Sequence, residues 1–252
     1  MSLHDRKSRP LLEIACFNGT SAISAAKGGA DRIELCHDYT SGGLSPNPSV
    51  LSQLKSQVSI PIYVMIRPHS EGFVYDKEDF ETMKSTLVAM KNAGADGFVF
   101  GILNQRTPGV TSPNSWVDIE KNTELVRLAG EKPCTFHRAF DCIPEQYWGA
   151  TLCEIAKCGF ASILTSGGPS GNTALECIDE LVRLFQELRR TEKCLPVGTV
   201  VPEIIVGGGV RSSNVRLLNE RTSAPVFHSS ALVNQTDEVD IHEVKKLREL
   251  IV

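Results

Sequence analysis

The chain is 252 residues long, with a formal net charge of −4 and a sequence pI near 5.9. This length suits one large domain, and the acidic balance offers no basic face for a nucleic-acid partner. No apolar segment approaches the roughly 18 residues that a membrane span requires, so we expect no membrane partner. Residues 1–10 are polar and basic without the apolar core of a secretory signal, and we expect a short N-terminal tail on a soluble, cytoplasmic protein.

From residue 11 onward, short apolar runs alternate with amphipathic helical stretches. Strands are predicted at residues 11–16, 32–36, 62–67, 97–102, 134–137, 162–165, 203–207 and 225–228. Helices are predicted at residues 20–28, 48–57, 77–93, 118–130, 144–158, 173–190, 212–220 and 239–250. Eight such units predict a (β/α)8 TIM barrel, with residues 11–252 as a single domain. The alternative is an open, doubly wound sheet.

Two acidic residues stand inside otherwise apolar strand runs. Glu13 and Glu34 are costly to bury as ionised groups unless they are paired or coordinated. One interpretation is a buried ion pair with Arg67 or Arg138. The other is a carboxylate pair that flanks a bound ligand at the C-terminal mouth, where burial raises one pKa for acid or base catalysis. Both interpretations hold together without conflict.

A second polar cluster follows the fifth predicted strand and contains His137, Arg138 and Asp141. Asp141 is close enough in sequence to orient His137 or to pair with Arg138, which favours a functional role for the cluster. Strand alternation places the side chains of His137 and Arg138 on opposite faces. Only one of the two is therefore expected to reach the barrel mouth, unless the strand has already ended.

Glycine and serine residues follow the last three predicted strands, where many TIM barrels bind phosphate. Consecutive glycines allow backbone NH groups to approach an anion at a helix N-terminus. The candidate ligand-binding residues are Ser166, Gly167, Gly207, Gly208, Gly209, Ser229 and Ser230. The alternative is that these glycines only permit tight turns.

The eight cysteines include no Cys-x-x-Cys pair, which favours reduced thiols. Cys16 and Cys36 end two successive strands, and neighbouring strands lie about 4.8 Å apart. Two such thiolates suit the soft ion Cu(I); the alternative is two thiols that pack independently. Glu13 and Cys16 have opposite strand parity, so Cys16 is expected to lie where the strand has given way to a loop.

Several segments together resemble the copper homeostasis protein CutC family. They are Leu-Glu-Ile-Ala-Cys at 12–16, Gly-Ala-Asp-Arg-Ile-Glu-Leu-Cys at 29–36, Gly-Gly-Leu-Ser-Pro at 42–46, Met-Ile-Arg-Pro at 65–68, Thr-Phe-His-Arg-Ala-Phe-Asp at 135–141, Leu-Thr-Ser-Gly at 164–167 and His-Ser-Ser at 228–230. The resemblance covers residues 11–231. It implies a cytoplasmic, homo-oligomeric TIM barrel that binds copper ions as Cu(I) through Cys16 and Cys36.

Two main hypotheses of function follow. The first is a Cu(I)-binding homeostasis protein, with Glu13, Glu34, His137 or Asp141 as polar support near the thiolates. The second is an enzyme (a lyase, isomerase or hydrolase) acting on a small anionic or phosphorylated metabolite. In it Arg67, Arg138 and the loop at 207–209 bind the anion while a glutamate or His137 moves a proton. A non-catalytic scaffold is a third option, and the sequence leaves open whether the protein is an enzyme.

Overall fold

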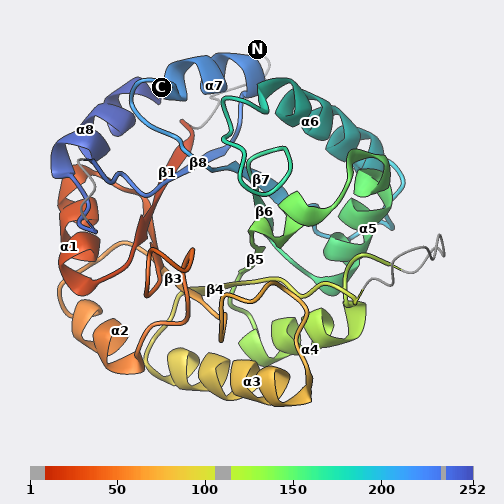
Figure 1. Cartoon of the computed structure of the whole chain (residues 1–252), viewed down its shortest axis with the longest axis horizontal. Coiled ribbons are helices and arrows are strands. Elements are labelled where there is room, and N and C mark those ends of the chain that lie inside the picture. The colour runs from red at the N-terminus through yellow and green to blue at the C-terminus, as the bar shows by residue number, and fades with distance from the viewer. Residues whose placement is uncertain (1–8, 106–114, 234–236, 252) are drawn as a thin grey trace, which may run out of the picture.

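The computed structural model describes residues 9–105, 115–233 and 237–251; residues 1–8 of the expected tail lie outside this range. Eight parallel strands form a closed barrel in sequence order (Figure 1). They are β1 (Leu11–Cys16), β2 (Arg32–Leu35), β3 (Ile62–Met65), β4 (Gly97–Phe100), β5 (Cys134–Phe136), β6 (Ser162–Thr165), β7 (Glu203–Val206) and β8 (Val226–Ser229). The predicted TIM barrel is confirmed.

The helices form a ring around the strands, as Figure 1 shows. They are α1 (Gly19–Gly28), α2 (Pro48–Leu54), α3 (Lys77–Asn92), α4 (Ile119–Ala129), α5 (Trp148–Cys158), α6 (Ile178–Glu192), α7 (Val215–Thr222) and α8 (Ile241–Leu250), with short 3-10 helices η1 (Arg138–Cys142) and η2 (Glu145–Tyr147) before α5. Among the described residues no helix combines the length and apolarity needed to cross a membrane.

Strand alternation divides the interior into two environments. In β1 and β2 the side chains of Leu12, Ile14, Ile33 and Leu35 belong to the main apolar core, which also contains residues of the surrounding helices. The intervening positions carry the polar residues, because successive side chains of a strand point to opposite faces. Glu34 and its neighbours therefore lie inside the barrel.

The helices α5 and α6 begin four and five residues later than the sequence pattern predicts. The segment before α6 is a turn in which Thr173 and Glu176 bond to each other: the backbone NH and hydroxyl of Thr173 each donate to Glu176 Oε2 at 2.8 Å. The 3-10 helix η2 likewise directly follows the predicted start at residue 144, and α5 begins only at Trp148. Both shifts lengthen the loops at the C-terminal end of the barrel, where the polar side chains gather.

Candidate functional site

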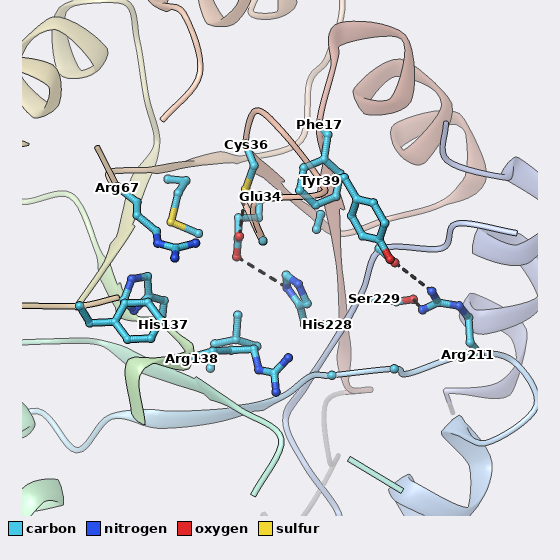
Figure 2. A pocket seen from close by; sticks show the side chains of 18 residues that line it. Phe17, Glu34, Cys36, Tyr39, Arg67, His137, Arg138, Arg211, His228 and Ser229 are labelled. Carbon is cyan, nitrogen blue, oxygen red and sulfur yellow. Dashed lines mark hydrogen bonds and ion pairs between the residues drawn. The ribbon is translucent and has the colours of Figure 1, made fainter. Parts of the chain in front are cut away.

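A cavity of about 280 Å³ opens among the loops at the C-terminal end of the strands (Figure 2). This is close to the lower end of the range of about 300–1,000 Å³ that is typical of small-molecule sites, so the cavity suits a small metabolite. Its ionisable lining side chains include Glu34, Arg67, His137, Arg138, Arg211 and His228. These groups come from β2 and β8 or from the loops that follow β3, β5 and β7.

Glu13 lies beneath this cavity, fully buried, at the closure of the barrel between β1 and β8. It accepts a hydrogen bond from Arg32 Nε and is 2.7 Å from His228 Nδ1. Burial alone would raise the pKa of Glu13, but the positive charges of Arg32 and His228 outweigh it and lower that pKa to about 2. Glu13 therefore forms a buried ion pair, as one interpretation of the sequence held. Its partners are Arg32 and His228, not Arg67 or Arg138.

Glu34 differs from Glu13 in having an unused oxygen. Its Oε1 accepts a hydrogen bond from the Cys36 thiol at 3.2 Å, while the buried Oε2 has no hydrogen-bond partner and is 3.7 Å from His228 Nδ1. Burial raises the pKa of Glu34, and the negative charge of Glu13 adds to this rise. Two neighbouring carboxyls thus have pKa values shifted in opposite directions, which is the arrangement that separates acid and base roles in enzyme sites.

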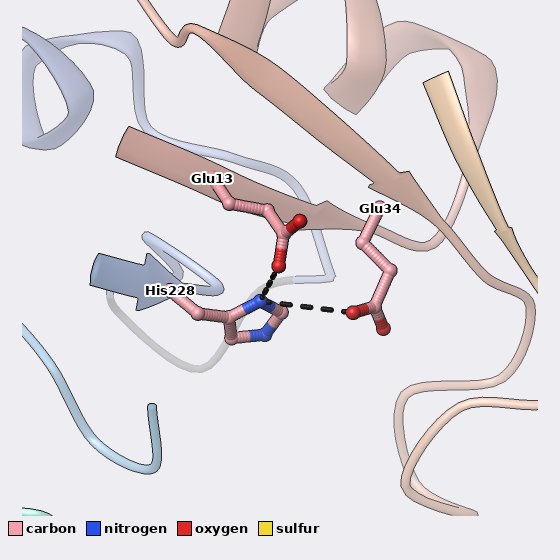
Figure 3. Close-up of side chains that lie close together, drawn as sticks. All are labelled: Glu13, Glu34 and His228. Carbon is pink, nitrogen blue, oxygen red and sulfur yellow. Dashed lines mark hydrogen bonds and ion pairs between the residues drawn. The ribbon is translucent and has the colours of Figure 1, made fainter. Parts of the chain in front are cut away.

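His228 joins the two carboxyls, and the three ligand atoms lie within 4.8 Å of one another (Figure 3). Such a cluster is the right size for a metal ion. Burial lowers the pKa of His228, but Glu34 and Glu13 more than compensate and raise it above its usual value. The two carboxyls therefore favour the protonated form of His228, whose positive charge lies between them. Oxygen-rich ligands are also a poor match for Cu(I).

Arg67 follows β3 and is held by backbone carbonyls. Its Nη1 donates to the carbonyls of Ser41 and Gly43 at 3.0 and 3.2 Å, and its Nη2 donates to that of Ser70 at 3.3 Å. The buried Nε has no hydrogen-bond partner. Within the described part of the chain no carboxylate pairs with Arg67, although the residue is only 7% exposed. An anionic group in the cavity would accept a hydrogen bond from Arg67 Nε and would also neutralise the charge of the guanidinium.

Arg211 lies on the other side of the cavity, beyond His228 in Figure 2. It donates to neutral oxygens: the Val210 carbonyl at 2.7 Å and the hydroxyls of Ser229 and Ser230 at 3.2 and 3.0 Å. No ion pair between Arg211 and another described residue is found. The guanidinium is therefore fixed in direction while its charge is not neutralised.

His137 and Arg138 both line the cavity, which is the exception that the sequence allowed for a strand that has already ended. The reason is that β5 ends at Phe136 and the 3-10 helix η1 begins at Arg138, so strand alternation no longer applies. His137 Nδ1 accepts a hydrogen bond from the backbone NH of Ala139 at 3.3 Å. The proton of the neutral ring therefore lies on Nε2, which is buried and has no partner.

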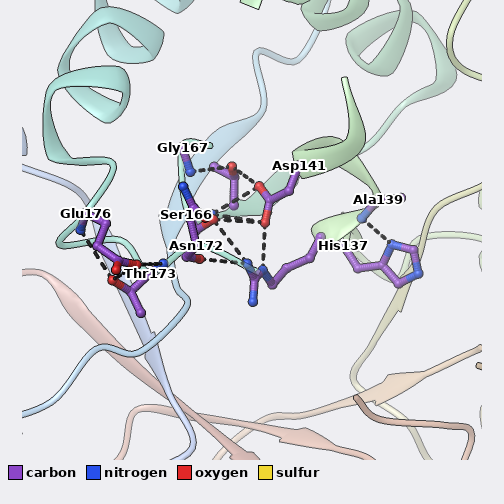
Figure 4. A network of polar contacts seen from close by, with 10 residues as sticks. His137, Ala139, Asp141, Ser166, Gly167, Asn172, Thr173 and Glu176 are labelled. Carbon is purple, nitrogen blue, oxygen red and sulfur yellow. Dashed lines mark hydrogen bonds and ion pairs between the residues drawn. The ribbon is translucent and has the colours of Figure 1, made fainter. Parts of the chain in front are cut away.

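Asp141 pairs with Arg138 and does not orient His137 (Figure 4). Arg138 Nε donates to Asp141 Oδ2 at 2.7 Å, and Asp141 also accepts hydrogen bonds from Thr165 Oγ1 and from the backbone NH and hydroxyl of Ser166. Arg138 Nη2 donates to Ser166 Oγ at 3.1 Å. Burial raises the pKa of Asp141 despite these partners. Asp141 therefore holds the Arg138 guanidinium in a fixed direction.

The glycine and serine residues predicted to bind an anion fall into two groups. Gly208, Gly209, Ser229 and Ser230 line the cavity. The other three lie behind its wall and do not line it: Ser166, Gly167 and Gly207. A Cβ at Gly208, whose φ is +91°, would lie 2.9 Å from Ser166 Cβ and 3.5 Å from the Arg138 guanidinium. This loop therefore runs directly against the arginine.

The two candidate copper ligands occupy different environments. Cys36 lines the cavity, whereas Cys16 is the last residue of β1 and belongs to the apolar core, with its thiol 3.5 Å from the Ile14 carbonyl. The strand does not give way to a loop at Cys16. The backbones are adjacent, since the NH of Cys36 donates to the Cys16 carbonyl at 2.8 Å. Burial raises the pKa of both thiols well above its usual value, and the Cys16 thiol is near enough to contribute to the shift of Cys36.

Three residues of this region were not among the predicted site residues. Arg32 and His228 complete the Glu13 network, and Arg211 supplies the second unpaired guanidinium. For Arg32 a signal was present: it shares the strand parity of Glu34, so the same alternation that places Glu34 inside the barrel also places Arg32 there.

Comparison with known sequences finds a match between residues 10–233 and the model of the CutC family. A copper homeostasis protein cutC homolog from Homo sapiens is 36% identical over 221 residues, which cover 88% of this chain and 73% of the human protein. A CutC family protein from Xylella fastidiosa is 36% identical over 220 residues, covering 87% of this chain and 74% of that protein.

Among solved structures, a CutC protein from Streptococcus agalactiae matches with a TM-score of 0.74 and 28% identity, covering 88% of this chain and 98% of the other. A phosphoribosylanthranilate isomerase from Thermotoga maritima matches with a TM-score of 0.58 and 13% identity, over 96% of this chain and 98% of the other. The second likeness concerns the fold alone.

Proposed function

Since the chain belongs to the CutC family, whose curated relatives include copper homeostasis proteins, we propose that it binds Cu(I) through the thiolates of Cys36 and Cys16. The observation that carries the proposal is the position of Cys36, whose thiol lines the cavity beside Glu34. Thiolates are the ligands that select Cu(I), because both partners are soft. The ion is the cargo of the protein in this proposal.

Two neighbours of Cys36 support the proposal. Met65 lines the same cavity and packs with Cys36 and Val99 in one apolar cluster, so a thioether is available beside the thiol. Cys16 contributes its sulfur if its side chain turns from the apolar core toward Cys36, whose backbone it already contacts. Cu(I) bound at this position would have two or three sulfur ligands, from Cys36, Met65 and Cys16. Glu13 and its partners would not be ligands.

The test is an anaerobic titration with Cu(I) against a competing chelator. Cys142 and Cys194 are exposed and would bind copper non-specifically, so all proteins carry Cys142→Ser and Cys194→Ser. In this background Cys36→Ser is expected to abolish tight binding of one equivalent, and Cys16→Ser is expected to weaken it. Cys134→Ser, which removes a buried thiol outside the cavity lining, is the matched control and retains full binding. Unchanged stoichiometry in the Cys16→Ser, Cys36→Ser double variant would refute the proposal.

A second candidate function is an enzyme that acts on a small anionic metabolite in the same cavity. The specific observation in its favour is the pair of unpartnered buried atoms, Glu34 Oε2 and His137 Nε2. A buried polar atom without a partner is costly, and such atoms concentrate where a ligand supplies the partner. Glu34 would accept or donate the proton, while His137 Nε2–H would donate a hydrogen bond to the oxygen that gains negative charge.

Proton transfer to or from carbon has a direct readout. A mixture of sugar phosphates and phosphorylated carboxylic acids is incubated in D2O with the protein, and loss of C–H signals is followed by ¹H NMR. Exchange that disappears in Glu34→Gln but persists in Glu203→Gln, an exposed glutamate of β7, supports the enzyme. Exchange at the same rate in Glu34→Gln as in the wild type would reject this role.

Cytoplasmic location and homo-oligomeric assembly also belong to this proposal. All eight cysteines are free, which is the state expected in a reducing compartment. Light scattering coupled to gel filtration measures the oligomeric state, and a mass near that of one 27.5 kDa chain would contradict the assembly.

A further inference from the structure

The cavity contains more positive charge than its own residues neutralise. Arg138 is paired with Asp141, but neither Arg67 nor Arg211 has a carboxylate partner among the residues that the structure describes. A buried guanidinium without a counter-charge is costly, and Arg67 is 7% exposed. The protein as a whole is acidic, with a net charge of −4. The excess positive charge is therefore a local property of the cavity.

The two unpaired arginines lie at opposite ends of the cavity. In Figure 2 Arg67 lies with His137 on one side and Arg211 on the other, with Glu34 and His228 between them. Phe73 contacts both His137 and Arg67. Its ring centroid is 4.8 Å from the centroid of the His137 ring and 5.1 Å from the Arg67 guanidinium. Arg67 Nε and His137 Nε2 are thus two buried donors without partners at one end.

The Arg211 end has the features of a phosphate site. Gly208 and Gly209 have φ angles of +91° and +73°, and their loop passes against Arg138. The hydroxyl of Ser230 lines the cavity beside Arg211. Two guanidiniums, a hydroxyl and a loop without side chains are suited to surround a tetrahedral dianion. The first end has a single arginine and a neutral imidazole, which suit the planar oxygens of a carboxylate.

We infer that the cavity binds a small phosphorylated hydroxy acid, with its phosphate at Arg211 and Arg138 and its carboxylate at Arg67 and His137. A hydroxyl between the two charged groups would donate to Glu34 Oε2, which is the unpartnered acceptor between the two ends. This assignment rests on the second function proposed above and is independent of copper binding. Among the residues that the structure describes, it accounts for each buried cavity-lining side-chain atom without a hydrogen-bond partner: Glu34 Oε2, Arg67 Nε and His137 Nε2.

The test is isothermal titration calorimetry at constant ionic strength with four probes: 3-phosphoglycerate, 2-phosphoglycolate, glycerol 3-phosphate and inorganic phosphate. The first has all three groups, the second lacks the hydroxyl and the third lacks the carboxylate. We expect 3-phosphoglycerate to bind at least about tenfold more tightly than glycerol 3-phosphate, because hydrogen bonds to charged groups are worth at least that factor.

Variants separate the two ends. His137→Phe removes the donor at the carboxylate end and is expected to weaken the two carboxylate probes about tenfold while leaving glycerol 3-phosphate within about twofold. Arg211→Gln is expected to weaken all four probes. Arg183→Gln, at an exposed arginine on α6, is the control and changes none. If His137→Phe does not fold, the smaller His137→Asn replaces it.

The outcomes separate failure of the two-ended site from failure of the proposed enzyme function on a small anionic metabolite. If the phosphate esters bind equally well whether or not they carry a carboxylate, the two-ended site is wrong while anion binding stands. If none of the four probes binds the wild-type protein, both the two-ended site and the anionic substrate are refuted. Selective loss of the carboxylate probes in the His137 variant supports the assignment.

Discussion

Glu13 and His228 lie on strands β1 and β8, 215 residues apart in sequence, and Glu13 Oε1 is 2.7 Å from His228 Nδ1. This contact joins the first strand of the barrel to the last. It also sets the charge of the cavity floor, because His228 is paired with Glu13 and lies 3.7 Å from Glu34. The stability of the fold and the chemistry of the cavity therefore depend on the same contact.

Glu13→Gln is expected to destabilise the protein by about 3–5 kcal/mol, because it leaves Arg32 and His228 buried without their counter-charge. The measurement is the free energy of unfolding from urea denaturation at pH 7. Glu203→Gln, at the exposed start of β7, is the control and is expected to change stability by less than about 0.5 kcal/mol. Equal stability of the two variants would show that the Glu13 ion pairs contribute nothing net to folding.

The neutral state of His137 predicts a pH dependence of stability. Burial, together with the positive charge of Arg67, lowers the pKa of His137 to about 3, against the usual value of 6.5. Between these values the unfolded chain binds a proton that the folded protein does not, so stability falls as the pH falls. The expected loss from this residue is about 2 kcal/mol between about pH 7 and pH 5.

His137→Phe removes this contribution, so its free energy of unfolding is expected to depend less steeply on pH than that of the wild type. His242→Gln, at an exposed position on α8, keeps the wild-type dependence. Parallel curves for the wild type and His137→Phe would mean that the pKa of His137 is the same in the folded and the unfolded protein. The buried ring would then gain a proton near its usual pKa of 6.5, and its Nε2–H would be a neutral donor only above that pH.

The fold was predictable from the sequence because each β/α unit has its own periodic pattern and its own glycine or capping signals. The inner positions of β1 and β2 were also predictable, since alternation alone places Glu13 and Glu34 inside. Of the two partners of Glu13, Arg32 shares the strand parity of Glu34, but nothing in the sequence pointed to His228. His228 reaches Glu13 only because the barrel closes, and no local pattern relates residues so far apart in sequence.

Local departures from regular structure limited the prediction of the site. Alternation placed His137 and Arg138 on opposite faces, but a 3-10 turn begins at Arg138 and brings both to the cavity. The reverse error concerned Cys16, which was expected in a loop and is instead the last residue of a regular strand, with its thiol near the Ile14 carbonyl. In both cases the error came from the exact residue at which a strand ends: β5 ends at Phe136, and β1 continues to Cys16.

Gly101 provides a test of how His137 is positioned. A Cβ at this glycine would lie 2.8 Å from His137 Nδ1, closer than real Cβ atoms approach, and 3.1 Å from Phe136 Cε2, which is tighter than most real contacts. Gly101→Ala is therefore expected to displace the imidazole, break its bond from the Ala139 NH and cost about 1–3 kcal/mol of stability. The His137 ring signals in NMR spectra report the displacement directly.

The matched control is Gly19→Ala on α1, where a Cβ would have ordinary contacts with Leu54 and Val50 at 3.8 and 3.9 Å. This variant is expected to leave both stability and the His137 signals unchanged. If Gly101→Ala also leaves the stability and the His137 signals unchanged, the residues around Gly101 can move to accommodate a methyl group. The contacts of the His137 ring would then not fix the direction of its Nε2–H.

The number of thiols that bind Cu(I) is expected to appear in the pH dependence of affinity. Cu(I) binds the thiolate, and burial raises the pKa of both Cys16 and Cys36, so each ligand releases a proton on binding. Below those pKa values the logarithm of the affinity rises by about one for each thiol per pH unit. The wild type is therefore expected to show a slope of about two between about pH 6 and pH 8, and Cys16→Ser a slope of about one.

Met65→Leu removes a thioether, which carries no proton, so it is expected to weaken binding without changing the slope. A slope of one in the wild-type protein would mean that Cys16 stays in the apolar core and that Cys36 is the sole thiolate ligand.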